Sequence, residues 1–96
     1  MKFVLILCEK VHNEKVMKLL ESQDIHGYTE VPMVLGAGVT GKRMDTRIFP
    51  GSGCLLFTLV ERQKADALVR ALKDFQASLL QGEGFRVFSM DADILL

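Results

Sequence analysis

Length, composition and charge already narrow what this chain can be. It has 96 residues, 49% of them apolar, which is enough to bury one modest core and too few for a second one. The 12 basic residues balance the 12 acidic ones, so no net field attracts nucleic acid or an anionic membrane, and generic nucleic-acid binding is not expected.

The first half of the chain predicts a strand, a helix and a second strand. The continuous apolar run 2–8 is typical of an inner strand. The next helix is predicted to begin near Asn13, a good N-cap type, with an inward face of Val16, Leu19 and Leu20. Residues 28–35 have strand composition but contain Pro32, which cannot donate to a sheet ladder. We therefore expect this strand to be bulged or at an edge near Pro32.

The second half repeats this order of elements. Residues 54–60 are predicted to form a strand, and a helix is predicted over 63–80 with the inward set Ala65, Leu68, Val69, Leu72, Phe75 and Leu79. A fourth strand is expected over 85–90, with Phe85, Val87 and Ser89 on one face and Arg86, Phe88 and Met90 on the other. The tail 91–96 ends in three apolar residues, and we expect it to dock on its own chain or on a neighbouring subunit.

The two halves are related by an internal repeat. The pattern from Cys8 to Leu20 returns from Val60 to Leu72, at an offset of about 52 residues. Each copy joins an apolar run, a charged pair and an amphipathic stretch. This favours two β-α-β units that share one sheet, which is an α+β fold of the ferredoxin-like βαββαβ type, with an antiparallel sheet and two helices on one face. Residues 1–96 are then a single domain.

The two cysteines bear on the compartment. Cys8 and Cys54 lie inside apolar runs and form no C-x-x-C pair. The apolar run that opens the chain is shorter than the core of a secretory leader, and it is better interpreted as the first strand. We therefore expect buried, reduced thiols, a cytoplasmic location and no direct membrane insertion.

The segment 36–53 carries the sharpest chemical signal. Gly36 to Arg43 fits the pattern G-x-x-x-x-G-K, but Arg43 replaces the magnesium-binding Ser or Thr, and no helix is expected to follow. An NTPase is therefore not expected. Glycine backbone N–H groups and the cations Lys42, Arg43 and Arg47 still suit an anion. The alternative is a solvated loop that binds no ligand.

Other candidate residues are less specific. Glu83 lies between two glycines, in either a plain turn that closes the second helix or a second phosphate- or sugar-binding turn. His12 and His26 flank the first helix too far apart to chelate one ion, and surface or capping roles are expected for both. The spacing of residues indicates no catalytic nucleophile beside a base, so we do not expect an enzyme.

The order of these motifs resembles the nitrogen-regulatory P-II superfamily over nearly the whole chain. The resemblance rests on Gly27-Tyr28-Thr29, on Gly36-Ala37-Gly38 before the basic segment, and on Gly82-Glu83-Gly84. It implies a homotrimer with a nucleotide site between subunits, formed by the base of a long T-loop, here 36–53, and by a turn called the B-loop. The implied ligand-binding residues are Thr29, Gly36, Gly38, Lys42, Arg43, Arg47, Gly82, Glu83 and Gly84.

The chain also departs from the family pattern. Phe85 stands where the family has its B-loop lysine, Arg86 is expected on the other face of the strand, and residues 91–96 contain no arginine pair. The loop is shorter than the T-loop and contains no tyrosine, so uridylylation is not implied. The expected effector is therefore ADP, AMP or another small anion.

Together these features predict a P-II-like signalling protein that binds its effector between subunits and regulates a partner through the 36–53 loop. The partner would be a protein, such as a membrane transporter or an enzyme. The alternative is a metal-binding or metal-tolerance protein of the same trimeric fold, with His12, His26, Met44 or a cysteine as ligands.

Overall fold

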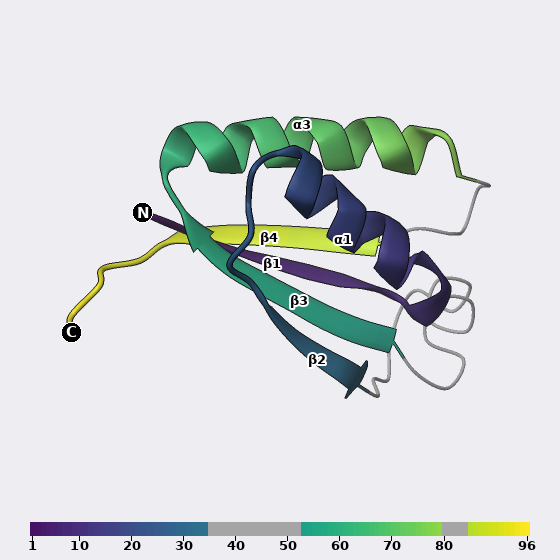
Figure 1. Ribbon diagram of the computed structural model, residues 1–96, viewed down its shortest axis with the longest axis horizontal. Coiled ribbons are helices and arrows are strands. Elements are labelled where there is room, and N and C mark those ends of the chain that lie inside the picture. The colour runs from purple at the N-terminus through teal and green to yellow at the C-terminus, as the bar shows by residue number, and fades with distance from the viewer. Residues whose placement is uncertain (35–52, 80–84) are drawn as a thin grey trace, which may run out of the picture.

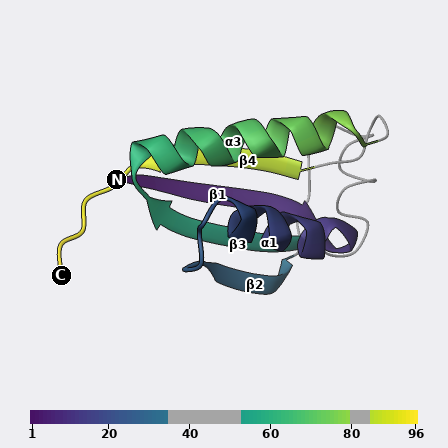
Figure 2. The same cartoon turned by 45° about the horizontal axis from the view of Figure 1, so that its top comes forward.

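The fold is a four-stranded antiparallel sheet with two helices on one face (Figures 1 and 2). The computed structural model describes residues 1–34, 53–79 and 85–96. The sheet has the order β2-β3-β1-β4. This is the predicted ferredoxin-like α+β sandwich, and β1 is an inner strand as expected. In chain order the elements are β1 (Lys2–Glu9), a 3₁₀ turn η1 (Lys10–His12), α1 (Asn13–Ser22), β2 (Thr29–Val34), β3 (Gly53–Val60), α3 (Arg62–Ala77) and β4 (Phe85–Asp91).

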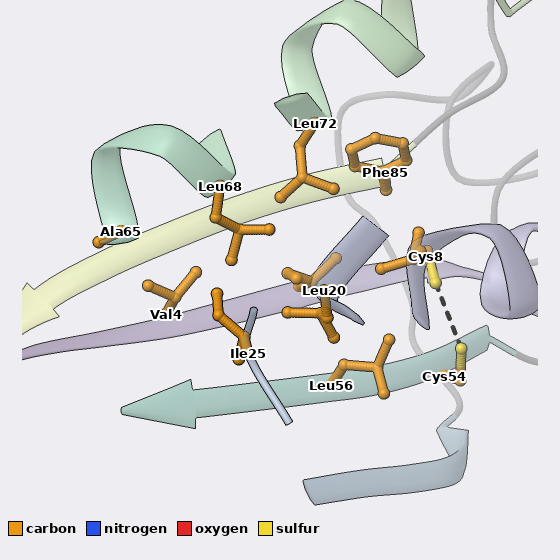
Figure 3. Close-up of a cluster of buried hydrophobic side chains, with 12 residues drawn as sticks. Val4, Cys8, Leu20, Ile25, Cys54, Leu56, Ala65, Leu68, Leu72 and Phe85 are labelled. Atoms are coloured by element: carbon orange, nitrogen blue, oxygen red, sulfur yellow. Dashed lines mark hydrogen bonds between the residues drawn. The ribbon is translucent and has the colours of Figure 1, made fainter. Parts of the chain in front are cut away.

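The core lies between the sheet and the two helices (Figure 3). Because side chains alternate along a strand, every second residue of β1 and β3 faces the helices. The internal repeat is visible in this core, since the equivalent pairs Val4 and Leu56, Val16 and Leu68, and Leu20 and Leu72 are all fully buried. The buried hydrophobic set is Val4, Ile6, Cys8, Val16, Leu20, Ile25, Cys54, Leu56, Ala65, Leu68, Leu72 and Phe85.

Strand β2 is an irregular edge strand, as Pro32 predicted. It pairs only with β3 in the described sheet, and its register shifts between Val31 and Val34. Proline has no backbone N–H to donate, so a break in the ladder at this position is tolerated at a sheet edge. The predicted segment 36–53 overlaps the next strand by one residue, because β3 begins at Gly53.

The first helix begins where predicted, but Asn13 is not its N-cap. The 3₁₀ turn η1 runs directly into α1, so Asn13 already has helical backbone angles and His12 takes the N-cap position without a side-chain capping bond. The Asn13 side chain instead donates a hydrogen bond from Nδ2 to Glu30 Oε2 of β2, over 2.6 Å. Asn13 therefore ties α1 to the edge strand.

A left-handed residue ends α1. Asp24 has a φ of 62°, the Ile25 N–H bonds the Leu20 carbonyl at 2.9 Å, and the Asp24 N–H bonds the Glu21 carbonyl at 2.9 Å. These two bonds are those of a Schellman motif, which satisfies the last carbonyls of a helix. The motif turns the buried Ile25 back into the core beside Leu20.

Helix α3 ends at Ala77, earlier than the predicted end at residue 80. The Ser78 hydroxyl donates to the Phe75 carbonyl at 2.6 Å, and the Ser78 N–H bonds the same carbonyl at 3.0 Å. Such local side-chain bonds compete with the helical ladder and favour a helix end. Of the predicted inward set, Ala65, Leu68 and Leu72 are buried and Val69, Phe75 and Leu79 are half-buried.

Strand β4 shows the predicted alternation, but the tail does not dock on its own chain. Phe85 is buried and Val87 half-buried toward the helices, whereas Phe88 is 51% exposed on the other face. Beyond the Ala92 N–H bond to the Met1 carbonyl, the tail extends away from the sheet (Figure 1). Leu95 is 87% exposed, so the half of the expectation that placed the tail on its own chain is wrong.

Candidate functional site

Thr29 is the predicted ligand-binding residue that lies within the described part of the chain. It is exposed and opens strand β2. The predicted anion-binding residues that fall outside the described ranges are Gly36, Gly38, Lys42, Arg43, Arg47, Gly82, Glu83 and Gly84, and Met44 of the metal alternative falls outside them too. Of the predicted site, the structure therefore describes Thr29 and the strand ends that flank the two predicted loops.

The strand residues that flank the segments 35–52 and 80–84 lie at one end of the sheet. Val34, which precedes the first segment, pairs with Gly53, which follows it, and Gly53 also faces Glu9 at the end of β1. Phe85, which follows the second segment, pairs with Cys8 next to Glu9. The strand register thus brings the predicted T-loop and B-loop anchors together (Figure 1).

Phe85 at the start of β4 is packed rather than presented to a ligand. Its ring stacks on Phe75 of α3 with centroids 5.6 Å apart, and its carbonyl accepts a hydrogen bond from Gln76 Nε2 at 3.0 Å. Arg86 pairs with Leu7 and lies on the opposite face of β4, as predicted. The position of the family's B-loop lysine therefore carries a buried, uncharged side chain.

His12 lies at the same end of the sheet and is buried, so the expected surface position is wrong. It is 9% exposed, and its ring meets Phe75 edge-on at 5.9 Å. Its Nε2 is 3.6 Å from Glu9 Oε1 and has no hydrogen-bond partner among the described residues. The signal that sequence reasoning missed is spacing, since His12, Val16 and Leu20 follow one another at four-residue intervals on one helical face.

A hollow lies beside the start of β2, around Thr29. It has a volume of about 500 Å³ and is lined by Phe3, Gly27, Tyr28, Thr29, Phe57, Thr58, Leu59 and Ala92. The Thr58 hydroxyl donates to the Gly27 carbonyl at 2.6 Å and fixes the approach to β2. Thr29 pairs with Phe57 and Val34 pairs with Gly53, so the two β2 residues are about 13 Å apart along β3. One subunit therefore holds Thr29 and Val34 at opposite ends of β2.

The face of the sheet opposite the helices is apolar. In the register Leu5 faces Phe57 on one side and Phe88 on the other, and Phe3 meets Phe57 with ring centroids 5.4 Å apart. No described helix covers this surface, which we call the open face (Figures 1 and 2). From the alternation along the strands, its apolar members are Phe3, Leu5, Leu7, Val31, Leu55, Phe57, Leu59, Phe88 and Met90.

The two cysteines are free and buried, as predicted. Cys8 and Cys54 face each other across β1 and β3 with their Sγ atoms 3.2 Å apart (Figure 3). Burial raises the pKa of both thiols, and at Cys8 the contact with Cys54 and the nearby Glu30 and Glu9 carboxylates add to the effect. Both side chains are therefore neutral near pH 7.

His26 occupies the predicted surface position. It is exposed, with Nε2 2.9 Å from Asp24 Oδ1 and Nδ1 3.5 Å from Glu21 Oε1. Residues 1–34, 53–79 and 85–96 contain no group of three His, Cys, Asp or Glu side chains arranged to hold a metal ion. Among the same residues, no helix is long and apolar enough to cross a membrane.

The sheet order and the two helices on one face define a small ferredoxin-like α+β protein. The profile of the family "Nitrogen regulatory protein P-II" matches residues 1–94, and the chain belongs to this family. No curated protein matches the chain by sequence.

Solved structures agree on the fold. CPII, a nitrogen regulatory PII-like protein from Thiomonas intermedia K12 bound to ADP, AMP and bicarbonate, is 22% identical, with a TM-score of 0.75 over 97% of this chain and 90% of that chain. CPII bound to ADP and bicarbonate is 21% identical, with a TM-score of 0.75 over 97% and 86%. A PII-like signalling protein from Thermus thermophilus is 17% identical, with a TM-score of 0.67 over 93% and 82%. At these identities the likeness establishes the fold.

Proposed function

We propose that this protein is a homotrimeric P-II-like regulator that binds ADP or AMP between its subunits and controls a protein partner through the 36–53 segment. The observation that carries this proposal is the register that brings the flanking residues of the two predicted loops, Val34, Gly53 and Phe85, to one end of the sheet. Membership of the P-II family supports it.

The open face supports the homotrimer. Exposed Phe88 and Met90 and half-buried Phe57 continue one apolar surface across the sheet. A contiguous apolar patch of this kind is uncommon on a monomer and marks a protein–protein contact. Burying it against the sheets of two further copies removes this surface from water, at about 25 cal/mol per Å².

The position of Thr29 supports a site shared between subunits. Thr29 opens β2 and Val34, which precedes the 36–53 segment, closes it. Their partners on β3 are Phe57 and Gly53, so the two residues are about 13 Å apart along the sheet. We infer that one ligand contacts Thr29 of one copy and the loops of another copy. The hollow around Thr29 offers apolar walls for a base, including Phe57 and Leu59, and the loops offer glycine amides and Lys42, Arg43 and Arg47 for phosphates.

The choice of ADP or AMP rests on charge and on the similar proteins. Structures of CPII, which has the same fold, are bound to ADP, AMP and bicarbonate. Phe85 is buried where the family has a B-loop lysine, so this chain has one cation fewer for a third phosphate. We therefore expect ADP and AMP to bind more tightly than ATP.

The protein acts as a regulator and not as an enzyme in this proposal. Effector binding sets the conformation of the 36–53 segment, and the partner, a transporter or an enzyme, binds one of the two conformations. Bicarbonate is a second effector to test, since CPII structures contain it together with ADP.

A thermal-shift panel with ADP, AMP, ATP, bicarbonate, zinc and copper tests this proposal, because a ligand of the folded state raises the melting midpoint. We expect ADP or AMP to raise it. Lys42→Glu combined with Arg43→Glu should abolish the shift and leave the melting midpoint of the ligand-free protein within about 2 °C. The matched control, Lys18→Glu with Lys73→Glu, makes the same charge change on the exposed faces of the helices and should keep the shift. A shift with metals alone would contradict the proposal.

A further inference from the structure

The buried thiols of Cys8 and Cys54 form a reactive pair that the proposed function does not use. The residues are partners in the β1–β3 register, and their Sγ atoms are 3.2 Å apart in the interior (Figure 3). Facing residues on antiparallel strands have Cα atoms about 4.5–5.5 Å apart. Disulfides span Cα separations of about 4.4–6.8 Å, so a bond requires rotation of the side chains and little movement of the strands.

We propose that Cys8 and Cys54 are an oxidative modification site, at which a low-molecular-weight disulfide such as oxidised glutathione converts the pair into an intramolecular disulfide. The bond would join β1 to β3 at the end of the sheet whose strand ends flank the predicted loops. The two bonded residues are 46 positions apart in the sequence, so the disulfide would close a long loop.

The chemistry is thiol–disulfide exchange in two steps. The thiolate of one cysteine attacks a sulfur of oxidised glutathione, whose S–S bond breaks and releases one glutathione thiolate. The second cysteine, as a thiolate, then attacks the protein sulfur of the mixed disulfide, forms the Cys8–Cys54 bond and releases the second glutathione. The protein loses two electrons and two protons, and one oxidised glutathione becomes two glutathione thiols.

Burial makes this site slow to react. Neither thiol is exposed, and burial raises both pKa values, so few thiolates form near neutral pH. Among the described residues, the charged groups that act on the pair are Glu9 at the end of β1, Glu30 on β2 and Lys10 on η1. Reaction therefore requires local opening of the strand ends, and its rate should rise about tenfold for each unit of pH increase below the thiol pKa.

The consequence for regulation rests on the proposed function. The pair lies next to Glu9 and Gly53, which face each other where the 36–53 segment joins the sheet. A disulfide fixes these strand ends before the ligand arrives, which lowers the ordering cost of binding. We expect oxidation to tighten ADP binding roughly threefold or more.

Peptide mapping tests the site without reference to any effector. The folded wild-type protein is incubated with oxidised glutathione at about pH 8.5, the free thiols are alkylated, and the digest is mapped by mass spectrometry. We expect a Cys8–Cys54 linkage and a melting midpoint raised by on the order of 10 °C, reversed by dithiothreitol. Cys8→Ala and Cys54→Ala, as matched controls, should show no rise in the melting midpoint.

Two outcomes would overturn the modification site. One is a folded protein that keeps both thiols while the same oxidant links them in urea. The other is linkage between chains in place of linkage within a chain. Because these measurements use only the wild-type protein, they hold even where a cysteine variant does not fold.

ADP titrations of the oxidised and reduced wild-type protein test the regulatory consequence. Tighter binding to the oxidised form supports it, and equal or weaker binding overturns it. If neither form binds ADP, the proposed function fails while the mapped disulfide still establishes the modification site.

Discussion

At the scale of single residues, Leu68 is one of the core side chains that pack the helices against the sheet. Leu68 is fully buried at the centre of the α3 contact. Leu68→Ala should lower the free energy of unfolding by about 2–5 kcal/mol, because it removes packed methyl groups and leaves a cavity. Urea denaturation measures this loss.

The matched control for this substitution is Leu95→Ala. Leu95 is 87% exposed on the tail, so the same change should cost less than about 0.5 kcal/mol in the monomer. Equal losses at the two positions would contradict the assignment of Leu68 to the core.

Asp24 offers a residue-level test by pH. The hydrogen bond from His26, with Lys64 nearby, lowers the pKa of the Asp24 carboxyl. A lowered folded-state pKa means that the stabilising contribution is present above the ordinary carboxyl pKa and is lost as pH falls through the lowered value. Because Asp24 is fully exposed, solvent screens this contribution.

His26→Ala should therefore raise the Asp24 pKa toward its ordinary value of about 3.9. Carboxyl-carbon NMR titration of both proteins measures the change. His12→Ala serves as the control, since His12 contacts Glu9 and Phe75 and should leave the Asp24 pKa in place. An unchanged Asp24 pKa in His26→Ala would contradict the assigned contact.

At the level of elements, the open face is the feature with the clearest consequence. Phe88 lies on β4 opposite Leu5 and is 51% exposed, so an aspartate there can be hydrated in a single subunit but not inside an apolar interface. Phe88→Asp should convert the proposed trimer to a folded monomer. Light scattering gives the mass and circular dichroism confirms the fold.

Val11→Asp is the matched control for this substitution. Val11 is 75% exposed on η1, away from the open face, and receives the same charge. It should remain a trimer. If Phe88→Asp also remains a trimer, the open face is not the interface.

The sequence predicted the elements well because their apolar periods are uninterrupted. The repeat indicated both β-α units, and Pro32 located the irregular edge strand. Local chemistry produced the errors, since the 3₁₀ turn removed Asn13 from the N-cap position and the Ser78 hydroxyl ended α3 early. These effects depend on backbone geometry over a few residues, which periodicity does not report.

The site was less predictable than the fold. Strand register, which composition does not encode, brings Val34, Gly53 and Phe85 to one end of the sheet and places Thr29 beside Phe57. His12 was missed because histidine is a common surface residue, although its four-residue spacing from Val16 and Leu20 indicated the buried face. The burial of Phe85 follows from its place in the strand alternation.

For the molecule as a whole, the central question is whether the trimer makes the ligand site. The chain belongs to the P-II family, whose proteins form homotrimers. In one subunit Thr29 and Val34 lie at opposite ends of β2, and the account has Thr29 of one copy and the loops of another contact the same ligand. The account therefore requires assembly before binding.

Calorimetric titration of ADP into the wild-type protein and into Phe88→Asp tests this requirement most directly. We predict saturable binding to the wild-type trimer and no measurable binding to the folded Phe88→Asp monomer. ADP binding of equal affinity to that monomer, or no ADP binding to the wild-type trimer, would contradict the account.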